Sequence, residues 1–344
     1  MSSLDTVLAI IHKRLSGVSA AVVPFGSRVI FPGHQGGDVD IVVILAGKEN
    51  DIIPRGKIPE EMQRVRRALV EPDLDNDDAS VLEIKKSLPN ARIPLLKVTH
   101  VPSQTPIDLV IHLGHPIVSS WFSRDIVQAS GLGKELIELV RNWAASKNIT
   151  RADAGMLPKY GYSLLVVAFL QKKGLLPANL FPTAEEDAVS KAKRPRLLAT
   201  GLDPTTYYTE GELIRFVALE EPARLLPWSP VLDAWQQSNA IRSKDSEVDE
   251  LFQQFLVDLE GKLSSEDSKP VTFREKRVAV LDEFKNTSDH LFVLRDPITS
   301  RNVACVLTPT TKVAILSEIA RARHALSTGS AISDLLSMKP LMNL

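Results

Sequence analysis

The sequence contains a single cysteine, no long hydrophobic run and almost no net charge. Because Cys305 has no cysteine partner within the chain, an internal disulfide is excluded, which fits a reducing compartment. The longest apolar run, Leu164–Leu170, is far shorter than the roughly 20 residues that span a bilayer, so no membrane span is expected. With 41 basic and 42 acidic side chains, the bulk charge does not indicate a nucleic-acid-binding protein. A partner of that kind has to be argued from local residues.

The amino terminus also lacks the basic start of a secretory signal. Residues 1–15 place Asp5 before an apolar stretch with amphipathic spacing, which predicts a first helix. We therefore expect an intracellular protein, with cytoplasm, nucleus and organelle matrix all open. At 344 residues and 44% hydrophobic content, the chain is long enough for two folded domains.

The first third of the chain has the pattern of short strands. Two β-branched runs, Ala20–Phe25 and Val39–Leu45, are separated by a glycine-rich turn. Two more runs, Ile93–His100 and Ile107–His112, are joined by a turn-rich segment. The polar region between the two pairs predicts helices at residues 59–70 and 79–88.

From Gly133 onward the pattern becomes helical, with apolar residues spaced three and four apart. Helices are predicted at Lys134–Lys147, Tyr160–Lys172, Glu210–Leu219 and Val248–Leu263. The expected fold class is therefore α+β. Residues 1–115 are expected to form a small mixed-sheet domain and residues 116–344 a mainly helical domain, with a cleft between them.

Three aspartates are candidates for a metal site. Because side chains alternate along a strand, Asp38 and Asp40 project to the same side. If Asp108 lies on an adjacent antiparallel strand, its carboxylate can face the same place. Three close carboxylates repel one another, and a hard divalent cation such as Mg²⁺ or Mn²⁺ relieves that repulsion. Taken alone, an Asp-x-Asp pair at the start of a strand is more often only a polar strand end.

A Gly-Ser pair stands ten residues before the first of these aspartates. Gly26 has no Cβ, so its backbone can approach a phosphate, and the Ser27 hydroxyl can donate to it. Two metal ions can clamp the attacking and leaving oxygens of a phosphoryl displacement. A Gly-Ser pair by itself is only a turn, so the prediction depends on the combination with the aspartates.

Motifs along most of the chain resemble one family. GS followed by ten residues and DVD, then RIPLLKV, PIDLVI, LVRNWA, KYGYSLLVVAFLQ and RDPITSRNVACVL, occur in order from about residue 24 to residue 307. They look like the DNA polymerase beta-type nucleotidyltransferases, and within them the branch of non-canonical poly(A) polymerases and terminal uridylyltransferases. The last motif is specific to that branch.

The resemblance implies a nucleotidyltransferase catalytic domain at residues 1–115 and a helical central, poly(A)-polymerase-associated domain at 116–344. It implies that Asp38, Asp40 and Asp108 are the catalytic, metal-binding triad for two Mg²⁺ or Mn²⁺ ions, and that Asp108 helps to deprotonate the RNA 3′ hydroxyl. It implies that Gly26 and Ser27 hold the β and γ phosphates of the nucleotide.

The resemblance also assigns nucleotide-binding roles in the helical part. Tyr160 corresponds to the aromatic residue that stacks on the incoming base, and Arg141 stands at a family lysine that touches the triphosphate. A second family lysine is replaced by Ala145, and we hypothesise that Lys159 supplies the missing charge. Without the resemblance, Tyr160 reads as a core-capping tyrosine and Arg141 as a solvated helix charge.

Two further departures concern the ribose and the base. The family's Asn-Thr pair appears as Ser119 and Ser120, and Ser120 is expected to keep the hydroxyl contact. Arg301, next to Asn302, replaces the histidine that favours UTP. Because arginine only donates hydrogen bonds, it would favour a base edge that presents acceptors, and the expectation leans to ATP over UTP or CTP. The alternative is that Arg301 pairs with an acid such as Asp296.

The expected function is template-independent transfer of a nucleotide from an NTP to an RNA 3′ end, with release of pyrophosphate. No separate RNA-recognition module is visible, so a targeting protein is one expected partner. One rival is a catalytically inactive scaffold of the same fold that binds RNA or protein. Another is a related transferase acting on tRNA ends, protein or a small molecule.

Two basic clusters could contact RNA phosphates but are more simply interpreted as solvated surface. They are Lys191, Lys193, Arg194 and Arg196, and Arg64, Arg66 and Arg67.

Overall fold

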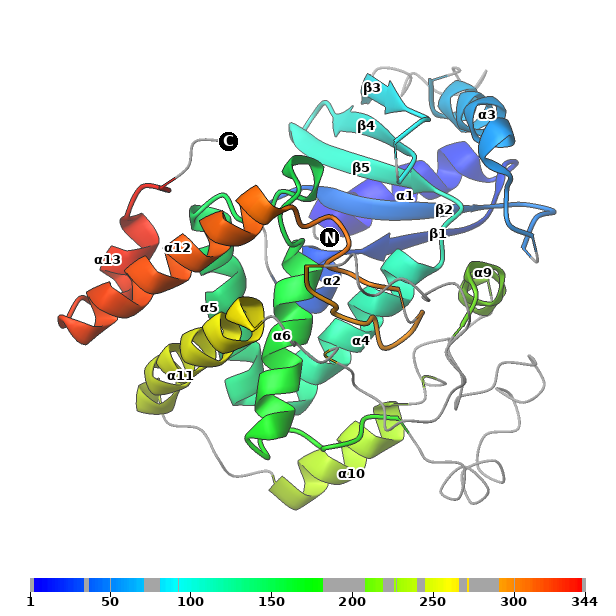
Figure 1. The fold of residues 1–344 in the computed structure, drawn as a ribbon. Coiled ribbons are helices and arrows are strands. Elements are labelled where there is room, and N and C mark those ends of the chain that lie inside the picture. Colours follow the sequence, from blue (N-terminus) through cyan, green and yellow to red (C-terminus); the bar gives the residue numbers. More distant parts are fainter. Residues whose placement is uncertain are drawn as a thin grey trace. The chain divides into compact units, whose positions relative to one another are not determined.

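The computed structural model describes most of the chain (Figure 1). The described residues are 3–33, 37–49, 51–70, 81–91, 93–181, 208–218, 226, 228–239, 245–265, 271, 291–299 and 301–341.

A mixed sheet of five strands, in the order β1-β2-β5-β4-β3, forms the centre of the amino-terminal part (Figure 1). The pair β2–β5 is parallel, and the pairs β1–β2, β5–β4 and β4–β3 are antiparallel. The strands are β1 (Ser19–Phe25), β2 (Val39–Leu45), β3 (Leu82–Leu88), β4 (Leu95–His100) and β5 (Thr105–Ile111).

One face of this sheet carries the hydrophobic core. Alternate residues of the central strands, such as Ile41 and Leu109, are fully buried there. The helices α1 (Ser3–Leu15) and α3 (Ile58–Val70) contribute apolar residues three and four positions apart to the same core. The residues of these two helices in the core are Val7, Ile11, Leu15, Met62, Val65 and Leu69. On the opposite face of β2 and β5, Val42, Ile44 and Val110 are also buried, whereas Asp40 and Asp108 are half-buried.

Helices make up most of the rest. They are α2 (Ser27–Ile30), α4 (His115–Ala129), α5 (Gly131–Ser146), α6 (Lys159–Lys172), α9 (Glu210–Val217), α10 (Ser229–Asn239), α11 (Asp245–Ser264), α12 (Pro309–Ser327) and α13 (Ile332–Ser337), with short 3-10 turns at Arg55–Lys57 and Ala152–Ala154. No helix in the described part of the chain combines the length and the hydropathy needed to cross a bilayer. The α+β fold class with a mixed sheet is confirmed.

Two sequence expectations about the sheet are wrong. The strand that carries Asp108 runs parallel to the strand that carries Asp40, not antiparallel to it. The segment expected as a helix at residues 79–88 is instead β3. Its Glu and Lys residues favour a helix in isolation, but Leu82 and Ile84 pack on the core two positions apart, as a strand requires.

The chain forms two compact units, and the division between them falls after Arg124, inside α4. The first unit holds the sheet and also α9, although α9 comes much later in the sequence. A buried carboxylate attaches α9: Glu210 accepts hydrogen bonds from the backbone N–H groups of Gly114 and His115 at the start of α4. Burial alone would raise the pKa of Glu210, but the hydrogen bonds from His115 and Gly114 outweigh it and lower the pKa.

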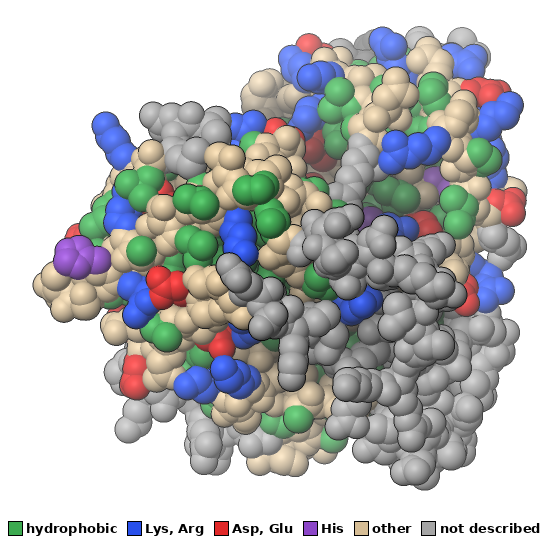
Figure 2. Space-filling view, viewed as in Figure 1, with side chains coloured by type: hydrophobic (Ala, Val, Ile, Leu, Met, Phe, Trp, Pro, Cys, Tyr) green, Lys and Arg blue, Asp and Glu red, His purple; other side chains and the backbone are tan. Residues whose placement is uncertain are grey.

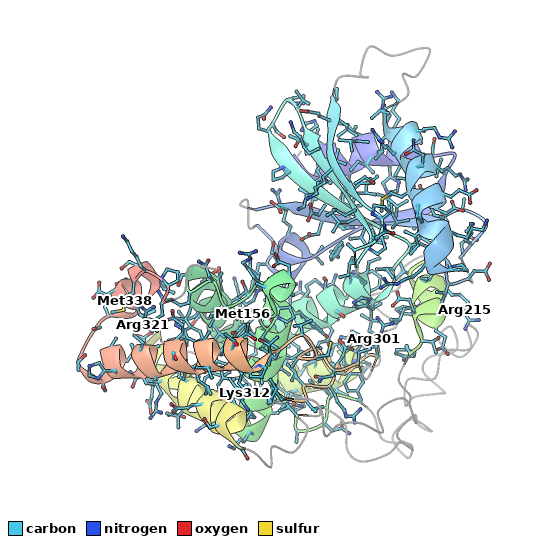
Figure 3. All side chains as sticks on the ribbon, turned by 45° about the horizontal axis from the view of Figure 1, so that its top comes forward. Met156, Arg215, Arg301, Lys312, Arg321 and Met338 are labelled. Atoms are coloured by element: carbon cyan, nitrogen blue, oxygen red, sulfur yellow. The ribbon has the colours of Figure 1, made fainter. Side chains whose placement is uncertain are left out.

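The second unit contains α5, α6 and α10–α13. Lys147, which directly follows α5, and Arg321 of α12 hold its last described segment. The buried Lys147 ammonium donates to the Met338 carbonyl over 2.6 Å, and Arg321, which lies next to Met338 in Figure 3, donates to the Lys339 carbonyl over 2.7 Å. Burial lowers the pKa of Lys147.

A buried histidine joins the end of β5 to the end of β2. The Nδ1 atom of His112 accepts the N–H of Leu45 over 3.1 Å, so Nε2 carries the proton and donates to the Asp51 carbonyl, 2.9 Å away. Burial lowers the pKa of His112 and the charge of Lys48 lowers it further, while the backbone hydrogen bonds to Asp51 and Lys48 and the charge of Glu210 oppose the change. Protonation would therefore remove the acceptor that Leu45 uses.

We predict that the free energy of unfolding falls as the pH drops below about 6.5, the ordinary pKa of histidine. The unfolded chain then binds a proton that the folded His112 resists, so the stability present above that pH is lost. His100, whose pKa burial also lowers, acts in the same direction. Urea unfolding at pH 7.5 and pH 5.5 measures the change, and the His112→Asn variant should show a smaller one. An equal change in the variant would show that His112 does not contribute.

Candidate active site

A row of charged residues crosses the sheet on the face opposite the core. Asp40 of β2 is the direct partner of Asp108 of β5, Asp108 is the partner of Lys97 of β4, and Lys97 is the partner of Lys86 of β3. Directly opposed residues project to the same side of a sheet. The register therefore aligns two carboxylates on neighbouring strands, followed by two ammonium groups, and we call these four residues the charged row.

Asp38 lies outside β2, one residue before its first residue, and its side chain is exposed. Arg28 of α2 fixes the preceding segment by donating to the Gly37 carbonyl over 2.9 Å. Asp40 and Asp108 are thus brought together as strand partners, and Asp38 stands two positions from Asp40. Within the described residues, no group of three or more His, Cys, Asp or Glu side chains is arranged to hold a metal ion. The structure therefore pairs Asp40 with Asp108, but it does not arrange three carboxylates around one point.

Lys97 contacts the third aspartate of the expected triad directly. Its Nζ atom lies 3.0 Å from Oδ1 and 3.1 Å from Oδ2 of Asp108, so it donates to both carboxylate oxygens. The Lys97 side chain is 45% exposed and that of Asp108 22%, which makes this a partly solvated ion pair. Sequence reasoning missed Lys97. The β4–β5 hairpin register, if worked out from its turn, would have placed this lysine opposite the aspartate.

Gly26 lies against the carboxylate of Asp40. Its φ angle is +75°, and a Cβ atom at this position would be only 2.1 Å from Oδ2 of Asp40. The N–H of Gly26 donates to the Ser120 hydroxyl over 2.9 Å, and that hydroxyl donates to the Pro116 carbonyl over 2.7 Å. The start of α2 is therefore attached to α4, and only glycine fits beside Asp40.

The two serines expected near the ribose differ in their surroundings. The Ser120 hydroxyl is used by Gly26 and Pro116, as described above. The Ser119 hydroxyl is buried and has no hydrogen-bond partner in the part of the chain that the structure describes. Ser119 is thus the better placed of the two for a further hydrogen bond, and the ribose contact of Ser120 stays a prediction.

Three expected nucleotide-binding residues lie in the second unit. Lys159 is the first residue of α6 and is exposed, and Tyr160 follows it and is half-buried. Arg141 lies on α5 and is buried, so it is not the solvated helix charge of the simpler reading. Their contacts with a nucleotide stay predictions.

Asn302 and Asp296 organise the loop before α12, in which Arg301 also lies (Figure 3). The Asn302 side chain accepts the N–H groups of Leu294 and Ala304 over 2.9 and 3.0 Å and donates to the Phe292 carbonyl over 3.1 Å. One carboxylate oxygen of Asp296 accepts the N–H groups of Ile298 and Thr299, both over 2.8 Å. In this structure the Asn302 amide shapes the loop from which Arg301 projects. Arg301 is exposed, and its contact with a base stays a prediction.

One of the two basic clusters, Lys191 to Arg196, lies outside the described residues. In the other, Arg64 pairs with Glu61 on α3 over 3.6 Å, while Arg66 and Arg67 are exposed.

We predict that Gly26→Ala destabilises the protein, because the new methyl group overlaps the Asp40 carboxylate. Gly33→Ala is the matched control: its φ is +93°, but no atom of the described residues lies within 4 Å of the position that its Cβ atom would take. Both variants carry the cost of a left-handed alanine, about 1–2 kcal/mol. Urea unfolding should show a larger loss for Gly26→Ala, and equal losses would refute the contact.

Comparisons with known proteins give one partial sequence match and a shared fold. No family model matches the chain. A stretch of 166 residues is 32% identical to Protein HESO1 of Arabidopsis thaliana, and the match covers 47% of this chain but only 30% of that protein.

Solved structures resemble nearly the whole chain. Cid1 in complex with its short product ApU matches with a TM-score of 0.64 and 18% identity, over 98% of this chain and 90% of that one. Terminal uridylyl transferase 4 from Trypanosoma brucei with bound UTP and UMP matches with a TM-score of 0.61 and 16% identity, over 94% and 92%. The Cid1 poly(U) polymerase with Mg 3′-dATP bound matches with a TM-score of 0.62 and 20% identity, over 96% and 91%. The chain thus shares the fold of these solved structures, and a segment that covers less than half of it is similar in sequence to Protein HESO1.

Proposed function

We propose that this protein is a template-independent RNA nucleotidyltransferase that transfers NMP from an NTP to the 3′ hydroxyl of an RNA. The observation that carries the proposal is the register that makes Asp40 and Asp108 direct partners, with Gly26 packed on Asp40. Paired carboxylates beside a Gly-Ser turn suit metal-assisted phosphoryl transfer. The fold shared with RNA-tailing enzymes supports the same chemistry.

The residues present fit divalent cations. Asp40 and Asp108 offer hard oxygen ligands on one face of neighbouring strands, and Asp38 adds a third carboxylate two positions before Asp40. The absence of a side chain at Gly26 leaves the Asp40 carboxylate its space. Two Mg²⁺ or Mn²⁺ ions, when bound, would stabilise the charge on the attacking and leaving oxygens.

The chain's own residues then have distinct tasks. Asp108 is proposed to accept the proton of the RNA 3′ hydroxyl, whose oxygen forms a bond to the α phosphorus of the NTP. The bond between the α phosphorus and the bridging oxygen breaks, and pyrophosphate leaves with the electron pair. The Ser27 hydroxyl and the cationic side chains of Arg141 and Lys159 are proposed to hold the triphosphate, while Tyr160 stacks on the base.

The base preference rests on two arguments, of which only the first favours one base. Solved neighbours are described as a poly(U) polymerase and as terminal uridylyl transferases, which favours UTP as the first nucleotide to test. The exposed Arg301 can only donate hydrogen bonds, which fits the acceptor edge of adenine as well as that of uracil. We propose UTP or ATP as the substrate, with CTP as a weaker candidate.

A targeting protein that selects the RNA is part of the proposal. It follows from the balanced charge of the chain, which gives little general attraction for RNA phosphates. The inactive scaffold finds no support in these comparisons.

We predict that the purified protein extends a labelled RNA oligonucleotide when it is given Mg²⁺ or Mn²⁺ and one nucleoside triphosphate. Asp40→Ala and Asp108→Ala should lower the rate at least about 1,000-fold, because each removes a charged group at the reacting centre. Asp249→Asn, an exposed acid on α11, is the control that should leave the rate unchanged. Each of the four common nucleoside triphosphates is tested alone to obtain the base preference.

No extension with any triphosphate, by a folded protein, would favour the inactive scaffold. Equal rates in the wild type and both aspartate variants would show that Asp40 and Asp108 take no part in the reaction.

We further predict that Lys159→Ala raises the KM for the triphosphate about tenfold with little change in kcat, because a phosphate-binding cation is lost from the ground state and the transition state alike. Lys134→Ala, an exposed lysine on α5, is the matched control. Steady-state kinetics with saturating RNA measure both constants. An unchanged KM would show that Lys159 does not replace the family lysine.

A further inference from the structure

The structure places a cation, Lys97, directly against a carboxylate of the charged row. Lys97 donates to both oxygens of Asp108, over 3.0 and 3.1 Å, from the strand opposite. We propose that Lys97 is the counter-ion of Asp108 while no metal is bound, and that a divalent cation must displace it to bind. Lys97 would then set the metal concentration that the protein requires. This inference rests on the proposed function of Asp40 and Asp108 as metal ligands.

The order of the strands gives the contact a direction. Asp108 lies on β5, between β2, which carries Asp40, and β4, which carries Lys97. Neighbouring strands are about 4.8 Å apart. Asp108 therefore has an aspartate as its partner on one neighbouring strand and a lysine on the other, and both of its carboxylate oxygens accept from that lysine. A cation shared by the two aspartates would need at least one of those oxygens.

The electrostatics favour Lys97 in this position when metal is absent. Asp40 and Asp108 are like charges on directly paired residues, an arrangement that costs free energy. The single positive charge of the Lys97 ammonium group, which lies beside Asp108, reduces this repulsion. The pair is partly solvated, with the lysine 45% exposed, so the attraction is modest and can be broken by a more highly charged competitor.

Lys86 adds a second reason for Lys97 to turn toward Asp108. The two lysines are direct partners across β3 and β4, so they repel each other. The neighbouring Lys85 differs, because it forms its own ion pair with Glu83 over 2.6 Å. Figure 2 shows several basic side chains over the region of β3, β4 and α3.

Competition and simple positioning predict opposite results for one substitution. If Lys97 competes with the metal, Lys97→Met removes a positive charge near the site, and divalent cations should bind roughly three- to tenfold more tightly. If Lys97 only orients Asp108 for the metal, the same change should weaken binding or leave it unaltered. Arginine keeps the positive charge, and its planar guanidinium can donate two hydrogen bonds to one carboxylate. Lys97→Arg should therefore bind the metal no better than the wild type.

The experiment is a titration of the metal-free protein with Mn²⁺, followed by electron paramagnetic resonance of the free ion, without nucleotide or RNA. The expected order of affinity is Lys97→Met above wild type, and wild type equal to or above Lys97→Arg. Lys85→Met is the matched control. It removes a positive charge from β3 that is paired with Glu83, and this variant should bind Mn²⁺ as the wild type does. Thermal unfolding of each variant confirms that it is folded.

The titration distinguishes a failure of the proposed competition from a failure of the proposed metal site. If the wild type binds Mn²⁺ and Lys97→Met binds it equally or more weakly, the competition is refuted while the metal site stands. If the wild type binds Mn²⁺ no better than Asp40→Asn and Asp108→Asn do, the metal site itself fails, and the proposed function loses its central support together with this inference.

Discussion

The pairing of β2 with β5 is the constraint on which the rest of this site depends. The two strands run parallel, and their register sets Asp40 beside Asp108 although the two are 68 residues apart in the sequence. Core residues next to each aspartate, such as Ile41 and Leu109, fix that register, because a shift by one residue would turn them away from the hydrophobic core. The hydrophobic core therefore determines which acids meet.

Around this pair, the structure uses small and polar residues to hold the functional groups. Gly26 leaves room for the Asp40 carboxylate, and its N–H attaches α2 to Ser120 of α4. Lys97 balances the charge of Asp108 from the far side of β5. The same few side chains thus serve the fold of the first unit and the chemistry proposed for it, so a substitution at Gly26 is expected to affect both.

Much of this arrangement can be predicted from the sequence, and the errors have physical causes. The β-branched runs predict the strands that carry the aspartates, and the family resemblance supplies the role of those aspartates. The direction of β5 relative to β2 cannot be predicted locally, because it depends on the order in which the strands pack into the sheet. Lys97 and the Glu210 attachment of α9 depend on contacts between separate segments, and Glu210 carries no local signal of its partners Gly114 and His115.

The most direct test of the central claim is a crystal structure of the protein soaked with Mn²⁺ and a non-hydrolysable nucleoside triphosphate, with the metal located by its anomalous scattering. We expect an anomalous peak within coordination distance, about 2.2 Å, of carboxylate oxygens of both Asp40 and Asp108. A well-occupied nucleotide whose metal contacts neither aspartate would contradict it.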